Sequence, residues 1–376
     1  MSIGVILMVS HIFRRLIAKW MSLIAIRNSF SNQNKLFSFL PIAGAFVTGV
    51  CLSLLFAACS STSTVNSPNP SATSVANSAS SKATLVRFGY QKSNILLKNK
   101  GVLEKRLSPD GISVEWIEFP AGPQLLEAMN VGSIDFGHVG ESPPIFAQAA
   151  GASLTYVAGI AASPGGSAIL VPQNSPIQKV TDLKGKKIAF QKGSSAHLLL
   201  VQALEKAGVK YSEIEPKYLP PADARAAFVK GSVDAWVIWD PFYAAAQEAT
   251  KARVLIDGTG INKQGGYYLT TRKFVTENPQ IVKAVLEEIQ QLEEWAKNHR
   301  EEVAQTLSSV LGIDIETMRK ATNRRTFGIV PINDELINLQ QQVADTYYQL
   351  KLIPKKVNVR DGVLSKEQYA AFSSKI

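Results

Sequence analysis

Cysteine is almost absent from this chain of 376 residues, which contains two, Cys51 and Cys59. Beyond Cys59 the chain has no thiol, so a disulfide framework, a Cys-based metal site and a Cys nucleophile are excluded there. Histidine is scarce as well, and two of the four, His138 and His197, follow predicted strands. No Gly-x-Ser-x-Gly, His-Glu-x-x-His or P-loop motif is present. Without a nucleophile–base set or a metal cluster, we expect a protein that is not an enzyme and that needs no cofactor or metal.

Acidic residues are missing from residues 1–58, where five basic residues precede an apolar run over 36–58. A basic flank, an apolar core and small residues before a cleavage point are typical of an export signal. The run ends in LFAAC at 55–59, which resembles the lipobox of bacterial lipoproteins. We therefore predict a lipoprotein-type signal peptide over 1–58 and lipidation of Cys59. The alternatives are a retained anchor, because the run can span a bilayer, and a true start at Met21.

Charge is also scarce over residues 60–83, which are mostly Ser, Thr, Asn, Pro and Ala with one charged residue, Lys82. Such a stretch cannot bury enough surface to fold, so 59–83 is predicted to be a disordered tether that holds a body near a membrane.

The chain beyond residue 58 has a small excess of basic residues. Taking the five basic residues of 1–58 from the total of 40 leaves 35, against 30 acidic residues. This mild excess is compatible with an anionic ligand or a membrane surface. There is no basic–aromatic stripe or zinc spacing, so nucleic acid binding is not expected.

The remaining chain contains an internal repeat. Four short segments recur in the same order at an offset of 99 or 100 residues: 88–92 as 188–192, 119–121 as 219–221, 131–135 as 230–234, and 141–143 as 240–242. This period is far too long for a solenoid. The repeat predicts two similar lobes in series, with a ligand cleft between them.

Strands alternate with helices in both halves of the repeat, which predicts a mainly parallel α/β sheet covered on both faces. We expect the first lobe over 84–174, the second over 175–265, and a return to the first lobe followed by C-terminal helices over 266–376. Ligands of such sheets lie beyond the carboxyl ends of the strands. The tail has apolar residues at helical spacing from Ile281 to Trp295, which predicts packing rather than chemistry.

A polar turn, QKGSSAH at 191–197, follows one predicted strand and precedes an apolar helical run over 198–204. The first amides of a helix have no partner within it, and the positive helix end favours an anion. The turn around Gly193, Ser194 and Ser195 therefore predicts an anion site. Gly-Ser at such a junction also serves capping alone, and this alternative stays open.

Two carboxylates, Glu141 and Asp240, occupy equivalent places after a strand and before a helix start that contains Pro. Asp240 suits a helix N-cap, whereas Glu is a poorer cap. Glu141 is thus the better candidate for the cleft, where it could order donors or meet an ammonium group. Trp239 ends a strand at the cleft rim and is predicted to wall the pocket. For His138 and His197, capping or exposure stands beside a role in the cleft.

Seven linked segments carry a family resemblance: GYQK at 89–92, EFPAGPQ at 118–124, NVGSID at 130–135, PPIFAQAAG at 143–151, FQKGSS at 190–195, PADARAAF at 221–228 and DAWVIWDP at 234–241. Through them the chain closely resembles bacterial aliphatic-sulfonate-binding proteins, receptors of ABC importers in the sulfonate/nitrate/taurine group. The resemblance implies an α/β, type II periplasmic-binding-protein fold. It also implies a monomeric receptor in the periplasm or cell envelope, a permease partner and a separate ATPase.

The resemblance further implies that an alkanesulfonate anion is held by donors from both lobes and covered by Trp239 and Tyr267. The residues expected to bind it are Gln91, Ser93, Gly140, Glu141, Ser142, Gly193, Ser194, Ser195, His197, Trp239, Asp240 and Tyr267. Taurine and nitrate are rival ligands, and Glu141 favours the ammonium group of taurine. Some relatives of the fold are enzymes of thiamine-precursor synthesis with a Cys-rich active stretch, which this chain lacks.

Overall fold

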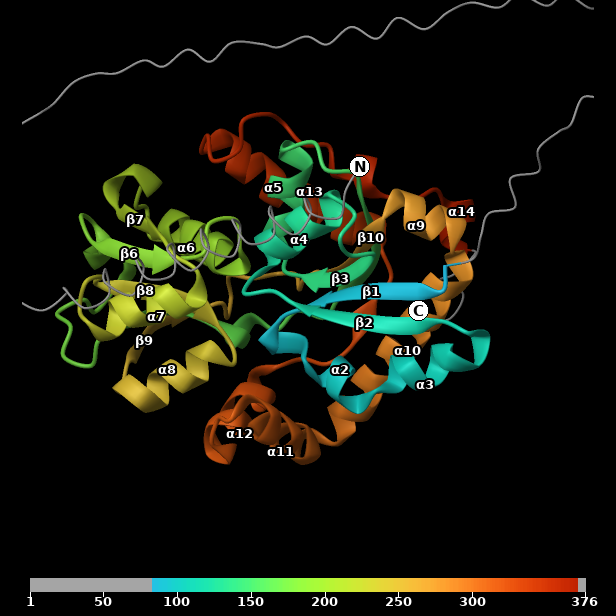
Figure 1. Cartoon of the computed structure of the whole chain (residues 1–376). Helices are drawn as coiled ribbons and strands as arrows, with labels where there is room; N and C mark the ends of the chain where they lie inside the picture. The colour runs from blue at the N-terminus through green and yellow to red at the C-terminus, as the bar shows by residue number, and fades with distance from the viewer. Residues whose placement is uncertain (1–82, 371–376) are drawn as a thin grey trace, which may run out of the picture. The chain divides into compact units, whose positions relative to one another are not determined.

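Residues 83–370 are described by the computed structural model (Figure 1). The predicted signal peptide, Cys59 and residues 59–82 of the predicted tether lie outside the described residues. Among the helices of residues 83–370, none is long and apolar enough to cross a membrane. Two β-sheets organise this part of the chain, and apolar clusters lie on both faces of each sheet, as the strand–helix alternation predicts.

The first sheet has six strands. In spatial order they are β11 (Ile329–Val330), β4 (Leu154–Ile160), β10 (Tyr267–Thr271), β3 (Phe136–Val139), β1 (Leu85–Tyr90) and β2 (Ser113–Glu118). β2, β1 and β3 are parallel, whereas β10 runs antiparallel to both β3 and β4. The sequence had indicated that the strand near residue 267 returns the chain to the first lobe, and its pairing confirms this.

The second sheet has five strands. In spatial order they are β7 (Glu215–Tyr218), β6 (Lys187–Phe190), β8 (Ala235–Trp239), β5 (Ser167–Val171) and β9 (Arg253–Asp257). β7, β6 and β8 are parallel, and β5 runs antiparallel to both β8 and β9. The order β8-β6-β7 thus repeats the order β3-β1-β2 of the first sheet, which is the three-dimensional counterpart of the internal repeat.

One carboxylate in each lobe makes this correspondence concrete. Asp135, just before β3, accepts a hydrogen bond from the backbone amide of Arg87 in β1, at 2.9 Å. Asp234, just before β8, accepts one from the amide of Lys187 in β6, at 2.7 Å. In both lobes the side chain bridges the same two neighbouring strands, so these repeated Asp residues have structural roles.

The chain crosses between the sheets over 161–166 and returns over 258–266, and these two segments lie together. The Ile160 amide donates to the Gly266 carbonyl at 2.9 Å, and a Cβ on Gly258 would lie 2.4 Å from the Pro164 carbonyl oxygen. Because β5 comes after the first crossing and pairs with β8 and β9, it belongs to the second sheet. The expected boundary at 174 had assigned it to the first lobe. An apolar strand such as β5 fits either sheet, so its sequence did not indicate which one it joins.

Helices cover both sheets. They are α2 (Leu96–Lys100), α3 (Val102–Leu107), α4 (Gly122–Asn130), α5 (Ser142–Ala149), α6 (Ser195–Lys206), α7 (Pro221–Val229), α8 (Phe242–Thr250), α9 (Arg272–Glu277), α10 (Pro279–Asn298), α11 (Arg300–Leu311), α12 (Ile315–Arg324), α13 (Asp334–Gln349) and α14 (Lys366–Ala370). The helices α2 and α3 are separated at Gly101, whose φ is +60°. Ile281 and Ile289 of α10 are buried in the first-lobe core, as their spacing predicted.

Gly266 lets the returning segment pass close to the end of β3. A Cβ there would lie 2.1 Å from the Val139 carbonyl oxygen and 2.9 Å from the Gly140 Cα. Because backbone atoms cannot give way cheaply, Gly266→Ala is expected to lower the free energy of unfolding by at least about 2 kcal/mol in urea denaturation. Gly165→Ala is the control, since its Cβ would meet nothing closer than 3.9 Å. Equal stability of the two variants would contradict this prediction.

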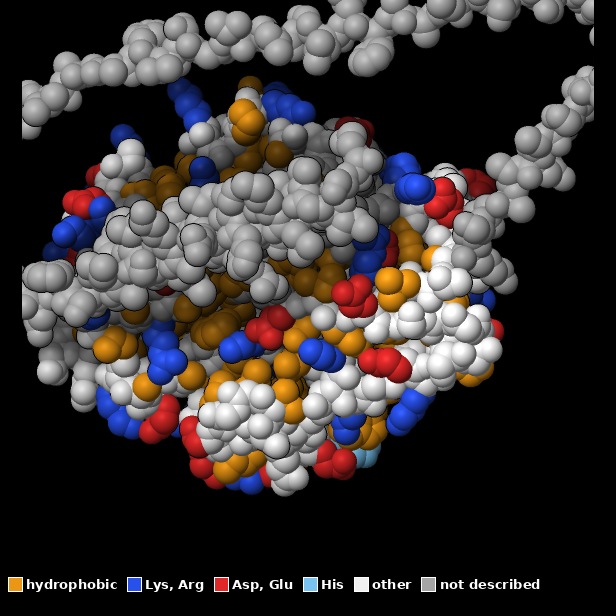
Figure 2. All heavy atoms as spheres, in the orientation of Figure 1, with side chains coloured by type: hydrophobic (Ala, Val, Ile, Leu, Met, Phe, Trp, Pro, Cys, Tyr) orange, Lys and Arg blue, Asp and Glu red, His pale blue; other side chains and the backbone are white. Residues whose placement is uncertain are grey.

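The face seen in Figure 2 carries basic and acidic side chains interspersed among apolar ones. On the part of this face that grey atoms do not cover, the basic side chains form no single patch.

Candidate functional site

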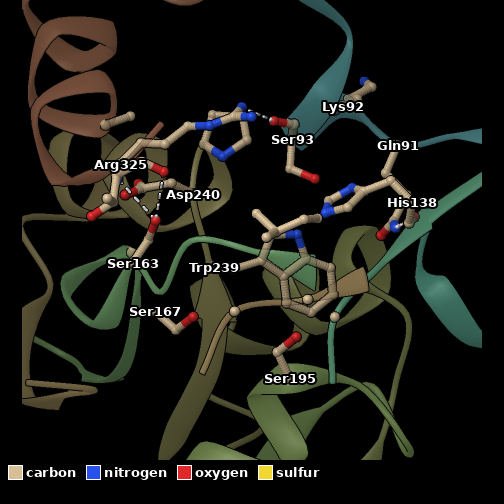
Figure 3. Close-up of a pocket in the computed structure, with 18 of the residues that line it drawn as sticks. Gln91, Lys92, Ser93, His138, Ser163, Ser167, Ser195, Trp239, Asp240 and Arg325 are labelled. Carbon is tan, nitrogen blue, oxygen red and sulfur yellow. Dashed lines mark hydrogen bonds between the residues drawn. The ribbon is translucent and has the colours of Figure 1, made fainter. Parts of the chain in front are cut away.

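A cavity of about 200 Å³ lies between the two lobes (Figure 3). It is at the carboxyl ends of two parallel strands from each sheet. Residues after β1 and β3 line it from the first lobe, and residues after β6 and β8 line it from the second. The predicted site residues that line it are Gln91, Ser93, Gly140, Glu141, Ser194, Ser195, Trp239 and Asp240. These residues lie at or after the strand ends where the sequence predicts the ligand, and they remain predictions as binding residues.

The turn before α6 supplies the second-lobe donors. Ser194 precedes the helix, and its hydroxyl donates to the Gln191 carbonyl at 2.7 Å. The amides of Ser195 and Ala196 belong to the first turn of a twelve-residue helix, where no intrahelical acceptor exists. The Ser195 side chain lies against Gly140 of the first lobe, where a Cβ would come within 1.9 Å of its hydroxyl oxygen. The two lobes therefore meet at Ser195.

Glu141 brings a carboxyl group to this meeting point. Its side chain hydrogen-bonds Ser195, and the residue is only 5% exposed. Burial raises the pKa of Glu141 to about 7, because water no longer solvates the ionised form, while the Ser195 hydrogen bond acts in the opposite direction. The residue precedes α5 but makes no side-chain cap, which agrees with its predicted place in the cleft.

Asp240 lies across the cavity from these groups and is already paired. Arg324, at the end of α12, donates from Nε and Nη2 to its two carboxylate oxygens, both at 2.8 Å. The Ala244 amide in α8 donates to the same carboxylate at 3.1 Å. The predicted capping role is thus only part of the account, because the main partner of Asp240 lies 84 residues away.

The first-lobe wall adds an imidazole and an amide. Gln91 Nε2 donates to the His138 carbonyl at 3.0 Å, which joins the ends of β1 and β3. The His138 pKa is lowered to about 3, first by burial and second by the charge of Arg325, so the ring is neutral at pH 7. Its Nδ1 atom is buried without a partner among the described residues. His138 therefore lines the cavity with a neutral ring, at the place in the cleft that the sequence left open.

Four predicted site residues lie behind the cavity wall. Ser142 shares a 2.8 Å hydrogen bond with the Tyr347 hydroxyl. His197 Nδ1 accepts from the Gly193 amide at 3.2 Å, so that amide is not free for an anion. Tyr267 is 1% exposed and packs against Tyr156. The prediction that these residues line the cavity is therefore corrected: they support its wall from behind. They are Ser142, Gly193, His197 and Tyr267.

Other lining residues were not among the predicted ones. They come from the residues after β1, from the crossing segments and the start of β5, and from the chain after α12, and they include Lys92, Ser163, Ser167, Asn262, Gln264 and Arg325. Arg325 donates from Nη1 to the Ser93 carbonyl at 3.0 Å and from Nη2 to Glu293 at 2.7 Å. The glycine pair at 265–266 is a sequence signal for a close chain crossing, since a Cβ on Gly265 or Gly266 would lie 2.2 or 2.1 Å from a backbone oxygen. No sequence signal connected Arg325 with Ser93, which lies 232 residues earlier.

Two α/β lobes joined by crossing segments, with a polar cavity between their strand ends, define a ligand-binding protein of the type that closes around a small molecule. In residues 83–370, no three His, Asp or Glu side chains are placed to hold a metal ion. The sequence and the fold are also similar to those of known proteins, which identify the family.

Residues 108–303 match the family described as NMT1/THI5 like. An Escherichia coli (strain K12) protein named for binding aliphatic sulfonates is 47% identical over 297 residues, which are 78% of this chain and 92% of that protein. The alkanesulfonate-binding protein SsuA of Xanthomonas axonopodis pv. citri, solved bound to MOPS, is 43% identical with a TM-score of 0.73, over 75% of this chain and 99% of that one. The periplasmic aliphatic sulphonate binding protein SsuA of Escherichia coli is 46% identical with a TM-score of 0.68, over 76% and 93%.

The chain therefore belongs to the NMT1/THI5-like family and, within it, to the aliphatic-sulfonate-binding proteins. It has their α/β, two-lobed periplasmic-binding-protein fold with a helical C-terminal region. The resemblance that the seven sequence segments carried is confirmed. These relatives are named as binding proteins, not as enzymes.

Proposed function

We propose that this protein is the extracytoplasmic receptor of an ABC importer and captures aliphatic sulfonates in the cavity between its lobes. The bound sulfonate is delivered to a permease that a separate ATPase drives, and it serves as a sulfur source. The receptor acts as a monomer in the periplasm or cell envelope. A lipid on Cys59 anchors it, and residues 59–83 act as its tether.

The observation that carries this proposal is the set of neutral donors at the meeting point of the lobes. A sulfonate keeps its negative charge throughout the physiological pH range, so its site needs hydrogen-bond donors and no general acid. The first-turn amides of α6 and the neutral His138 ring are suited to this task, and so is the Ser195 hydroxyl when Glu141 is protonated and no longer has to accept its hydrogen bond. Trp239 supplies an apolar surface beside them for the hydrocarbon part.

Calorimetry of the purified protein against ethanesulfonate, taurine, nitrate, sulfate and bicarbonate tests the proposal. We expect ethanesulfonate to bind and to raise the melting temperature, because a ligand that binds only the folded state stabilises it by mass action. Binding of nitrate or bicarbonate with no binding of sulfonates would overturn the proposed ligand while leaving a transport role.

Taurine is a second candidate, and Glu141 is the observation that favours it. A buried carboxylate beside an anion site can pair with the ammonium group of a zwitterionic sulfonate. Its raised pKa means that a substantial fraction is neutral near pH 7, which also suits a ligand without an ammonium group. The two ligands therefore make opposite demands on the protonation of Glu141.

Ser195→Ala is expected to raise the sulfonate Kd at least tenfold, because a hydrogen bond to a charged group contributes about 1.5–3 kcal/mol. Ser194→Ala is the matched control with a smaller effect, since the Ser194 hydroxyl donates to the Gln191 carbonyl at every pH, whereas protonation of Glu141 frees the Ser195 hydroxyl. Calorimetric titration of both variants measures the difference. An unchanged Kd in Ser195→Ala would contradict the placement of the sulfonate at the start of α6.

A further inference from the structure

Two lysines occupy equivalent places in the two lobes. Lys92 follows β1 and Lys192 follows β6, and each comes directly after a glutamine in the repeated segments 88–92 and 188–192. The cavity lies at the carboxyl ends of these strands: Lys92 lines it, and Lys192 comes two residues before Ser194, which also lines it. The repeat therefore brings one ammonium group from each lobe to the edge of the cavity.

Both ammonium groups face the solvent. Lys92 and Lys192 are exposed, and in Figure 3 the Lys92 side chain points away from Trp239. The Lys192 ammonium lies 5.3 Å from the centre of the ring of Tyr218, a residue that is 44% exposed at the end of β7. Neither lysine has an ion-pair partner within residues 83–370. Their charges are therefore available to an anion that approaches from the solvent.

The other charged side chains that line the cavity do not offset the two lysines. Asp240 and Arg325 are each held in an ion pair, at 2.8 and 2.7 Å. Glu141 is buried, and because burial raises its pKa to about 7, it does not carry a full negative charge at pH 7. The cavity wall therefore presents no carboxylate that cancels the charge of its lysine edge.

The charges beside the strand ends balance one another. Glu118, at the end of β2, and Lys98 hydrogen-bond the same tyrosine hydroxyl, at 3.1 and 2.8 Å. In the first turns of α7, Asp223 lies two residues from Arg225. The two lysines thus give this edge of the cavity a net positive charge.

We propose that Lys92 and Lys192 form a cationic rim that draws the sulfonate anion toward the cavity and raises its association rate constant, kon. This inference rests on the proposed function, which makes an anion the ligand. Clefts lined by one sign of charge focus the electric field and raise the rate of encounter with an ion of opposite sign. Because both ammonium groups stay in water, they should speed the arrival of the ligand and hold the bound ligand only weakly.

Lys192→Glu is the most direct test, because Lys192 itself does not line the cavity. Binding of ethanesulfonate to the purified protein is followed by stopped-flow fluorescence, with Trp239 of the cavity wall as the probe. At about 0.05 M salt, Lys192→Glu should lower kon about threefold and leave the dissociation rate constant, koff, within about twofold of the wild type. Lys92→Glu combined with it should lower kon about fivefold. At about 0.5 M salt, screening should reduce both differences in kon to less than about twofold.

Lys230→Glu is the matched control on the same lobe. It changes the net charge of the protein as much as Lys192→Glu does, and Lys230 is also exposed. Lys230 directly follows α7, a helix of nine residues and therefore about 13 Å long, which starts near the strand ends. Because salt screens charges over such a distance, Lys230→Glu should leave kon within about 1.5-fold of the wild type. Melting curves establish that both variants are folded.

The outcomes separate this inference from the function on which it rests. Equal kon in Lys192→Glu and Lys230→Glu, with ethanesulfonate still bound, would overturn the cationic rim and leave the receptor function standing. An effect of Lys192→Glu on koff alone, insensitive to salt, would also overturn it, because the lysine would then contact the bound ligand. Absence of binding by every sulfonate would overturn the proposed function and this inference with it. If Lys192→Glu fails to fold, Lys192→Gln, which removes the charge without reversing it, decides the question through the salt dependence of kon.

Discussion

Asp240→Ala is expected to lower the free energy of unfolding by about 2–3 kcal/mol, as measured by urea denaturation at pH 7. The value lies between those of exposed and buried ion pairs, because the Asp240 and Arg324 side chains are 15% and 22% exposed. Removal of the carboxylate leaves the Arg324 guanidinium without its two 2.8 Å partners. Its contact with the Tyr243 ring, 3.9 Å away, cannot replace them.

An ion pair between α12 and α8 supplies a matched control. Lys320 of α12 pairs with Glu248 of α8 at 3.7 Å, but both side chains are about half exposed or more. Lys320→Ala should therefore change stability by less than about 0.5 kcal/mol. In a double-mutant cycle, the additional loss from Arg324→Ala in the Asp240→Ala background should be small. Fully additive losses would mean that the two residues do not act as a pair.

This ion pair also bears on ligand binding. The apolar face of α12 packs in the first-lobe core through Met318 and Ala321, whereas Asp240 follows β8 of the second lobe. The pair therefore joins the two lobes beside the cavity. We expect ligand to dissociate faster from Asp240→Ala than from Lys320→Ala in stopped-flow measurements, because Asp240→Ala removes an ion pair that holds the two lobes together around the cavity.

The internal repeat explains why much of the fold was predictable. Three of the four repeated segments lie at or just after the end of a strand, so local patterns located the strand ends, and the rule for parallel sheets brought them together as one cavity. Gln91, Ser195 and Trp239 were found in this way. The helical spacing of apolar residues in α10 is also a local pattern, and it predicted the burial of that face of the helix.

The parts that were missed depend on contacts between residues far apart in the sequence. Arg324 and Arg325 were interpreted as part of a packing tail, yet they reach Asp240 and Ser93 in different lobes. His197 shows the opposite error. It lies in the first turn of α6, whose start was predicted to bind an anion, but its ring faces inward. The ring centre lies 4.9 Å from that of Phe190 and 5.2 Å from that of Tyr347. A pattern of residue types does not show which way such a ring faces.

Glu141→Gln is expected to raise the free energy of unfolding by about 3 kcal/mol at pH 8 and to leave it nearly unchanged at pH 4. The native pKa of Glu141 is raised to about 7 from its ordinary value of 4.5. Between these values the unfolded chain has already lost its proton while the native chain still holds it. The wild-type stability therefore falls as the pH rises through this window, and glutamine removes that loss.

Glutamine suits the site because its side-chain oxygen can still accept the Ser195 hydrogen bond. Glu277→Gln, at the exposed end of α9, is the control for the Glu-to-Gln substitution itself. Denaturation curves at pH 4, 6 and 8 provide the comparison. A constant stability difference between Glu141→Gln and the wild type across that range would mean that Glu141 ionises as an ordinary surface carboxyl does.

The same variant separates the two candidate ligands. Ionised Glu141 would repel a simple alkanesulfonate, so wild-type affinity for ethanesulfonate should fall above pH 7, while the affinity of Glu141→Gln should stay level. For taurine the sign reverses if its ammonium group pairs with Glu141, because affinity then rises with pH and is lost in Glu141→Gln. Since the head group is the same in both ligands, the direction of the pH dependence reports on the carboxyl group alone. Titration of both ligands at pH 6 and 8 thus determines whether Glu141 serves as a neutral donor to a sulfonate or as the counter-charge of an amine.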